Sequence, residues 1–271
     1  MNYRWKPATL RLAVLISLVG LLILMSGDAT QPAQAQTTLP RFNLVGNAVG
    51  HADRLGLTVN ERLQTGAAWL PDKEQVQNGF EATFDWQINR ANPRRGGDGF
   101  AFVVHNADLP LPGLALGGGG NGLGYSGIPN SLAVEFDTVQ NPPADFGLGT
   151  KSDPNDNHIS VQTRGQEANS ANTDFSLAFI TQAELPVPLF TVGRHTTKIV
   201  YKPGDQGNPG NIAIYLDNME RPILNAYVNL AELLSLDEGK AWVGLTAATG
   251  SRFQAHDIYT FTFTPSEPAQ Q

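Results

Sequence analysis

Metal-ligand side chains gather in one short part of the sequence. They are two carboxylates, an amide, a further carboxylate and an imidazole, in the order Glu135, Asp137, Asn141, Asp153 and His158. Carboxylate and amide oxygens are the ligands that calcium prefers, and imidazole suits transition-metal ions. This spacing predicts a metal site.

The element that must position the two acids is a strand. The run Ser131–Thr138 is apolar, rich in β-formers and alternating, so Glu135, Asp137 and Val139 should point to one face with successive Cα atoms about 7 Å apart. Two acids on one face can share a cation or a pair of cations. The competing interpretation is that these are ordinary exposed acids on a strand with one face in solvent.

The rest of the chain predicts an all-β fold. Gly, Pro and Asn clusters separate the strand candidates, which is typical of a sandwich or barrel. The candidates are 41–46, 79–88, 99–105, 131–138, 158–163, 175–180, 194–201, 211–217, 222–228, 240–246 and 256–263. One short helix is expected at 229–236, with Asn229 as its cap and Glu232 completing a capping box.

The N-terminus has the composition of a targeting segment. Residues 1–35 carry a basic start, an apolar run at 12–25 and an Ala-Gln-Ala cleavage site, which predicts a secretory signal peptide. A membrane anchor is the rival interpretation, but the apolar run is short for a bilayer span. We therefore expect a short leader at 36–40, a secreted or periplasmic protein without a membrane span, and a disordered tail at 265–271.

The net charge limits the classes of binding partner, and the cysteine content limits the sources of stability. The whole chain carries a net charge of −7, and removal of residues 1–35 leaves 15 basic and 24 acidic residues, or −9. An acidic protein is a poor partner for nucleic acid. Because the chain has no cysteine, extra stability must come from the core or from bound ions.

Several motifs, in one linear order over about 41–264, resemble the legume-type (L-type) lectins, and we expect a secreted bacterial member. The motifs are Gly97–Phe102, Gly117–Gly124, Ala133–Thr138 with Asn141, Asp153-Pro154, His158-Ile159, Trp242–Ser251, and His256–Tyr259 with Phe261. The resemblance implies a concanavalin-A-like jelly-roll β-sandwich of antiparallel sheets. It also implies no catalytic activity and carbohydrate bound at the end of the concave sheet.

The resemblance further implies calcium and a transition metal, manganese in the plant proteins, side by side beneath the sugar. By position, Glu135 and His158 would bind the transition metal, and Asp137 and Asp153 would bridge both ions. Asn141 and the carbonyl of Val139 would bind calcium alone. The expected sugar contacts are Asp98, a backbone N–H at Gly119 or Gly120, the Asn141 amide, and Gly250, Ser251 and Arg252. In the family the peptide bond before this Asp is cis, here Gly97-Asp98.

Two departures from the plant pattern leave alternatives open. Val139 stands where an aromatic residue commonly stacks on the sugar, so either Tyr125 or Phe146 stacks on the sugar or stacking is missing. The stretch between Asn141 and Asp153 is longer than in plant lectins. It makes Asp145 and Asp156 competitors for the bridging role, for which the Asp-Pro pair favours Asp153.

A glycoside hydrolase on the same jelly roll is the main functional alternative. Retaining hydrolysis needs a second carboxyl about 5–5.5 Å from the first, but Val139 and Gln140 occupy the candidate positions. An adhesion or scaffold domain that has lost sugar binding is a third possibility. The expected partners are glycans or glycoconjugates and, in a homo-oligomer, further copies of the chain; the sequence does not fix which glycan.

Overall fold

The computed structural model describes Met1 and residues 39–89, 96–145, 147, 149–190, 193–205 and 208–267. Except for Met1, the expected signal peptide lies outside these residues, as do 36–38 of the leader and 268–271 of the tail. The chain divides into two units, Met1–Gln36 and Thr37–Gln271, and every strand of the described residues belongs to the second unit.

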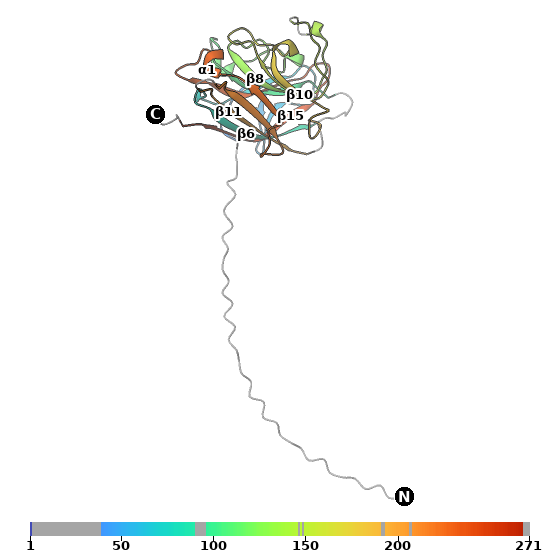
Figure 1. Cartoon of the computed structure of the whole chain (residues 1–271). Helices are drawn as coiled ribbons and strands as arrows, with labels where there is room; N and C mark the ends of the chain where they lie inside the picture. The colour runs from blue at the N-terminus through green and yellow to red at the C-terminus, as the bar shows by residue number, and fades with distance from the viewer. Residues whose placement is uncertain are drawn as a thin grey trace, which may run out of the picture. The chain divides into compact units, whose positions relative to one another are not determined.

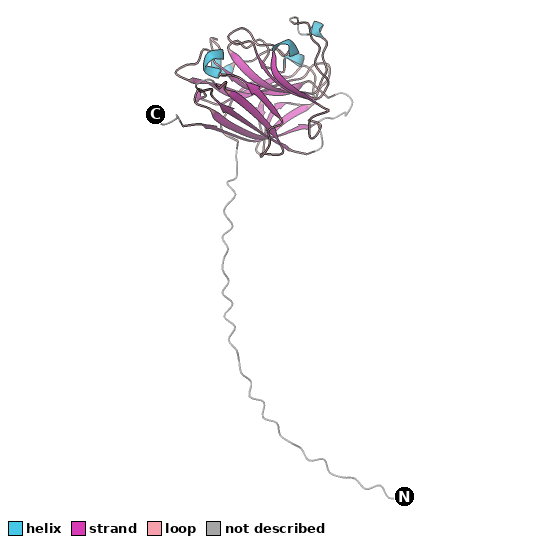
Figure 2. Cartoon of the chain, viewed as in Figure 1, coloured by secondary structure: helices cyan, strands magenta, loops and turns pink. Residues whose placement is uncertain are grey.

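Two antiparallel sheets form the described fold, with only short helical turns in the loops (Figures 1 and 2). One sheet has the order β1-β4-β14-β7-β8-β9-β10, and β5 also pairs with β14. Its strands are β1 (Asn43–Gly46), β4 (Thr65–Trp69), β5 (Glu74–Gln75), β7 (Gly99–His105), β8 (Ser131–Asp137), β9 (His158–Thr163), β10 (Ser176–Thr181) and β14 (Lys240–Ala248).

The second sheet has the order β13-β12-β11-β6-β15-β3-β2. Its strands are β2 (Val49–Gly50), β3 (Leu55–Thr58), β6 (Phe80–Asn89), β11 (His195–Lys202), β12 (Asn211–Leu216), β13 (Leu224–Tyr227) and β15 (Ala255–Pro265). The helical turns are η1 (Pro112–Leu114), η2 (Gly120–Gly122), η3 (Pro143–Asp145), η4 (Thr173–Phe175) and α1 (Leu230–Leu233). No helix of the described residues is long and apolar enough to cross a membrane.

Each of the eleven expected strand ranges overlaps a strand, so the all-β prediction is confirmed. Four short strands, β2 to β5, were not expected. The helix is shorter than predicted, but its cap is present, because the Asn229 side chain accepts a hydrogen bond from the Ala231 N–H at 3.2 Å. Glu232 completes the cap differently from a capping box, since its carboxylate accepts from the Asn229 side-chain amide at 2.9 Å.

The main core lies between the sheets and is rich in aromatic rings. Phe100 of β7 and Phe136 of β8 are cross-strand partners whose rings stack with centroids 4.5 Å apart, and Trp86 of β6 packs on both. Offset stacking at this distance adds to the burial energy of the rings. This core holds β7 and β8 in register where the predicted site begins.

A second apolar cluster covers the other face of the first sheet. Ala133 of β8 and Trp69 of β4 lie there, buried beneath Leu123, Tyr125 and Ile128, which belong to the long segment between β7 and β8. Strand side chains alternate, so Ala133 and Glu135 share a face while Val134 and Phe136 face the main core. The acids of β8 therefore lie under a loop instead of facing water.

Candidate metal and carbohydrate site

The two acids of β8 are buried. Glu135 is 0% exposed and Asp137 is 1% exposed, so the interpretation as exposed acids on a strand with one face in solvent is wrong. A buried carboxylate needs hydrogen bonds or a counter-charge to offset its loss of hydration. The two residues meet this need differently.

Protein donors surround Glu135. The Tyr125 hydroxyl donates to Oε2 at 2.5 Å, and the Ser160 hydroxyl and the Gln162 amide donate to Oε1 at 2.6 and 2.9 Å. Both carboxylate oxygens are thus satisfied without an ion. Tyr125 is fully buried in this role, so the expectation that its ring stacks on a sugar is wrong; Phe146 lies outside the described residues.

Sequence reasoning missed these partners of Glu135. Ser160 and Gln162 follow His158 at two-residue steps in β9, which places all three on one face of the strand that pairs with β8. The alternation of β9 could have identified them. Tyr125 comes from the segment over the sheet, and no local pattern points to it.

Asp137 and Asp153 have fewer donors. The Val139 N–H donates to Asp137 Oδ1 at 2.7 Å, and the Asn141 N–H donates to Asp153 Oδ2 at 2.9 Å. Burial, together with the nearby Asp153 and Glu135 charges, raises the pKa of Asp137 well above its usual value. Burial and Glu135 likewise raise the pKa of Asp153. Such repulsion between buried acids is relieved by a bound cation.

The three candidates for the bridging acid differ in burial. Asp153 is 2% exposed, whereas Asp145 and Asp156 are exposed side chains. Asp145 accepts a hydrogen bond from the side-chain amide of Asn141 at 3.2 Å. Only Asp153 lies buried with the acids of β8, which supports the preference for the Asp-Pro pair.

Two predicted ligand atoms are buried and lack a hydrogen-bond partner: Asn141 Oδ1 and His158 Nε2. His158 Nδ1 lies 3.1 Å from the carbonyl of Asn155, and only a protonated nitrogen can pair with a carbonyl. In the neutral imidazole Nε2 would then present a lone pair, and it lies 3.6 Å from Glu135 Oε1. An imidazole oriented through Nδ1 in this way is the usual arrangement of a metal ligand.

The donor set fits calcium better than the expected pair of ions. As the side chains stand in the described ranges, no three His, Asp or Glu residues are arranged to hold a metal ion. The set of Glu135, Asp137, Asp153 and His158 is thus not assembled. Calcium needs oxygen ligands, and two buried carboxylates, the unpaired Asn141 Oδ1 and the Val139 carbonyl are of the right kind.

The expected sugar residues come together because their strands are neighbours. Asp98 precedes β7, Asn141 follows β8, and Gly250 follows β14, and β14, β7 and β8 are adjacent in the sheet. The Gly97-Asp98 peptide bond is cis, as expected. Ser251, Arg252 and Gly119 are exposed, and Gly120 and Gly250 are half-buried.

Asp98 is the main polar group at this meeting of loops. It is 5% exposed, its Oδ2 has no hydrogen-bond partner, and burial raises its pKa to about 7. A Cβ at Gly250 would lie 2.9 Å from Oδ2 and one at Gly120 would lie 3.9 Å from it. The backbones of these two glycines thus lie close to this buried carboxylate oxygen, and at Gly250 a side chain would press against it.

Val139 packs inward instead of offering a flat surface. It is 5% exposed, and a Cβ at Gly97 would lie 2.5 Å from its Cγ2. The same hypothetical Cβ would lie 2.9 Å from the Cβ of Arg252. Gly97 thus allows the loops before β7 and after β8 and β14 to approach closely.

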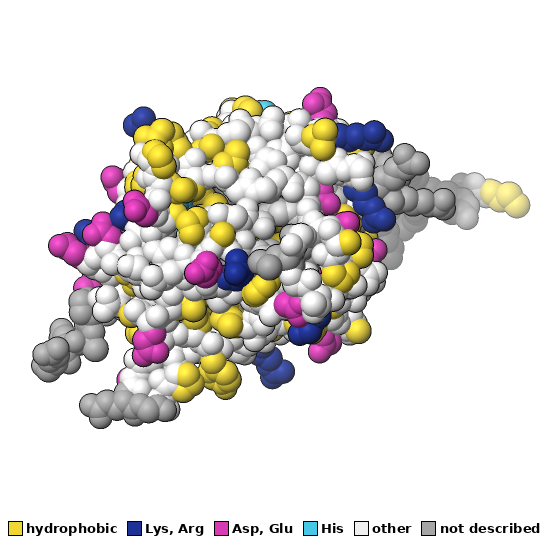
Figure 3. Space-filling model, turned by 90° about the horizontal axis from the view of Figure 1, so that it is seen from above, with side chains coloured by type: hydrophobic (Ala, Val, Ile, Leu, Met, Phe, Trp, Pro, Cys, Tyr) yellow, Lys and Arg dark blue, Asp and Glu magenta, His cyan; other side chains and the backbone are white. Residues whose placement is uncertain are grey.

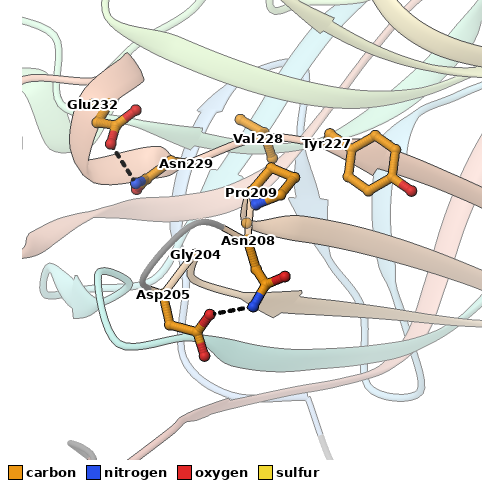
Figure 4. Close-up of a pocket in the computed structure, with 9 residues that line it drawn as sticks. Gly204, Asp205, Asn208, Pro209, Tyr227, Val228, Asn229 and Glu232 are labelled. Carbon is orange, nitrogen blue, oxygen red and sulfur yellow. Dashed lines mark hydrogen bonds between the residues drawn. The ribbon is translucent and has the colours of Figure 1, made fainter.

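Elsewhere on the surface, charged side chains are scattered. Seen from above, Lys and Arg do not gather into a patch on the visible face (Figure 3), in line with the acidic composition. A separate pocket of about 670 Å³ is bordered by two hydrogen-bonded pairs, Asp205 with Asn208 and Asn229 with Glu232 (Figure 4). None of the predicted site residues lines this pocket.

Known proteins are similar to this chain in sequence and in architecture. The legume lectin domain model matches residues 36–271. A lectin from Onobrychis viciifolia is 30% identical over 190 residues, or 68% of this chain and 66% of that lectin. The chain spans between 15% and 66% of the length of the curated relatives it matches.

Solved structures agree on the fold. A Bauhinia forficata lectin in complex with GalNAc has a TM-score of 0.62 at 22% identity, over 82% of this chain and 91% of that one. The exoplasmic/lumenal domain of VIP36 in its Ca²⁺/Man-bound form has a TM-score of 0.59 at 17% identity, over 86% of each chain.

Two stacked antiparallel sheets of this kind define a concanavalin-A-like jelly-roll β-sandwich. The chain belongs to the legume lectin family. Membership makes a non-enzymatic, carbohydrate-binding protein the expected class. The bacterial origin stays a prediction.

Proposed function

We propose that this protein is a secreted or extracytoplasmic lectin that binds a glycan at the loops around Asp98. The observation that carries the proposal is the buried, unpaired Asp98 Oδ2 between Gly120 and Gly250. An ionised carboxylate there would accept hydrogen bonds from sugar hydroxyls. Backbone N–H groups at Gly119 or Gly120, the Asn141 amide, and the loop of Gly250, Ser251 and Arg252 would supply further contacts. Secretion rests on the composition of residues 1–35.

Calcium is the ion that we propose organises this site. Asp137, Asp153, the Asn141 side-chain oxygen and the Val139 carbonyl would hold it, and its charge would offset the repulsion between the buried acids. Asn141 would serve both ligands, with its oxygen toward calcium and its NH₂ toward the sugar. That NH₂ now donates to Asp145, so a bound glycan would take over this donor.

A transition metal beside calcium rests on the resemblance. His158 Nε2 is unpaired and suitably oriented, while Glu135 already accepts three hydrogen bonds. Manganese would have to displace some of these donors. Elemental analysis of the purified protein decides whether one ion or two are held.

We infer no glycosidase activity, because Val139 and Gln140 stand where a second carboxyl would be needed. An adhesion or scaffold role without sugar binding is the second candidate. The inward packing of Val139 favours this role, because none of the residues assigned to the sugar site has an aromatic ring that could stack on a sugar. Assembly into a homo-oligomer remains a proposal. Hydrolysis of β-glucan or cellulose that is lost in Glu135→Gln would contradict the lectin proposal.

The test of function is glycan binding by the mature protein with calcium and after chelation. On a glycan that the wild type binds, Asp98→Ala should weaken binding by about 2 kcal/mol or more, because the sugar hydroxyls lose their charged acceptor. Asp156→Ala, an exposed acid outside the site, is the matched control. Wild-type affinity in Asp98→Ala would place the glycan elsewhere.

A further inference from the structure

A series of four buried side chains runs from β3 of the second sheet to the backbone carbonyl of Asp98. They are Thr58, His256, Gln254 and Thr138, with exposed fractions of 1%, 1%, 0% and 2%. The links are Thr58 Oγ1 to His256 Nδ1 at 2.7 Å, His256 Nε2 to Gln254 Nε2 at 2.9 Å, Gln254 Nε2 to Thr138 Oγ1 at 2.8 Å, and Thr138 Oγ1 to Asp98 O at 2.8 Å.

The contacts of this series are consistent with one assignment of donors and acceptors. The Thr58 hydroxyl donates to the carbonyl of Gln254 at 3.2 Å, so its oxygen accepts from His256 Nδ1. His256 Nε2 is then the acceptor for one amide hydrogen of Gln254, and the other goes to Thr138. The Thr138 hydroxyl is thereby left to donate to the Asp98 carbonyl. In this arrangement each of these donor hydrogens has an acceptor within the series.

The network joins two of the loops assigned to the glycan. Gln254 closely follows Gly250–Arg252, and Thr138 ends β8. The Asp98 carbonyl also accepts from the Thr138 N–H at 2.9 Å, and the Asp98 N–H donates to the Ala248 carbonyl at 3.0 Å. The main chain of Asp98 is therefore held between the ends of β8 and β14, with Gln254 and Thr138 behind it.

We propose that Gln254, with His256 and Thr138, forms a positioning network for the glycan site. It holds the Asp98 main chain and the Gly250–Arg252 loop in fixed relation to each other without touching the ligand. A satisfied buried network specifies one geometry, whereas apolar residues of similar size allow several. A site held by such a supporting layer keeps its contacting groups in binding geometry. The ligand is that of the proposed function, but the coupling of the loops is a property of the chain alone.

Thr138 offers a matched set of variants. Thr138→Val keeps the shape and removes the hydroxyl, and Thr138→Ser keeps the hydroxyl. The control is Thr163→Val, because the buried Thr163 hydroxyl also donates to a backbone carbonyl, that of Ser131 at 2.8 Å, at the opposite end of β8. Amide hydrogen exchange of segments 96–99 and 249–254, glycan titration at saturating calcium, and calcium titration are measured for each variant.

In Thr138→Val we expect about tenfold faster exchange in both segments. Glycan binding should be about tenfold weaker, with calcium affinity within about twofold of the wild type. Thr138→Ser should restore exchange and binding. Thr163→Val should change neither, even where it lowers the melting midpoint equally. Gln254→Met, which has similar length and no donor, replaces Thr138→Val if that variant fails to fold.

Wild-type exchange in both segments of Thr138→Val would overturn the inference, whatever the glycan titration shows. Equal acceleration in Thr163→Val would also overturn it, since the effect would then be general loosening of the fold. If the wild type binds no glycan but exchange accelerates only in Thr138→Val, the network is upheld and the proposed function fails.

Discussion

At the residue scale, the acids of the site divide into two kinds. Glu135 is satisfied by hydroxyl and amide donors, so its charge is stabilised by the protein itself. Asp137, Asp153 and Asp98 are buried with raised pKa values. Backbone N–H groups offset the burial of these three carboxylates only in part, so a cation or ligand would stabilise their negative charge further. On this difference we base the proposal that Glu135 is a structural carboxylate and that the other three acids bind ligands.

Calcium affinity should depend on Asp137 and hardly on Glu135. Asp137→Asn removes a charged ligand and should weaken calcium binding at least about 100-fold, or about 2.7 kcal/mol. Glu135→Gln should change calcium affinity less than about threefold. Titration calorimetry on chelated, desalted protein measures both variants, and equal losses in the two would contradict the assignment.

Local spacing predicted most of the candidate ligands, because Glu135, Asp137 and Asn141 lie within one strand and its loop. The contacts of Tyr125 and Gln254 could not be predicted in this way. Gln254 meets Thr138 across 116 residues, and His256 meets Thr58 across 198. Such pairs are set by the packing of the sheets and not by any pattern in the neighbouring residues.

At the element scale, the strands that sequence reasoning missed lack the patterns it uses. β4 reads Thr-Gly-Ala-Ala-Trp, with small residues of low strand propensity. Residues 66–69 are all buried, so no alternation of apolar and polar side chains appears. β4 pairs with β1 and β14 inside the sheet, and this pairing stabilises a strand that its own residues do not favour.

Gly66 of β4 should not tolerate a side chain. A Cβ there would lie 2.0 Å from the Leu57 carbonyl oxygen and 2.9 Å from the Ala48 nitrogen, both rigid backbone atoms. Gly66→Ala should therefore destabilise the fold by at least about 3 kcal/mol. Gly50→Ala, whose nearest neighbour would be a Leu44 methyl at 3.8 Å, is the control. Urea unfolding compares them, and similar midpoints would argue against this close approach.

At the scale of the whole molecule, the calcium that we propose would take the place that disulfide bonds often have in exported proteins. The chain has no cysteine, and the buried acids Glu135, Asp137 and Asp153 repel one another near the end of β8. An ion that binds only the folded state stabilises it by mass action. The stability of the sandwich and the occupancy of its site should thus change together.

Calcium at 100 times its dissociation constant should add about 2.7 kcal/mol, a rise in melting midpoint of roughly 5–10 °C. The pKa of Asp153 is raised to about 7 in the ion-free fold, above its value of about 3.9 in an unfolded chain. Protonation therefore stabilises the ion-free fold as pH falls below 7 and competes with calcium. The difference between calcium-loaded and ion-free midpoints should narrow from pH 7.5 to pH 5.5. Calorimetry tests this, and equal midpoints at pH 7.5 would mean that calcium does not bind.

The position of β15 has a consequence for how the chain reaches its folded state. Among the described residues β15 is the last strand in chain order, and it lies inside the second sheet, between β6 and β3. The sheet is therefore complete only when β6, which begins at residue 80, has paired with β15, which begins at residue 255. During synthesis the sandwich cannot close until residues up to β15 (Ala255–Pro265) have emerged from the ribosome. Pairing across such sequence distances is slow. We therefore expect recognition of a ligand to arise late and in a single step, when β14 and β15 are in place.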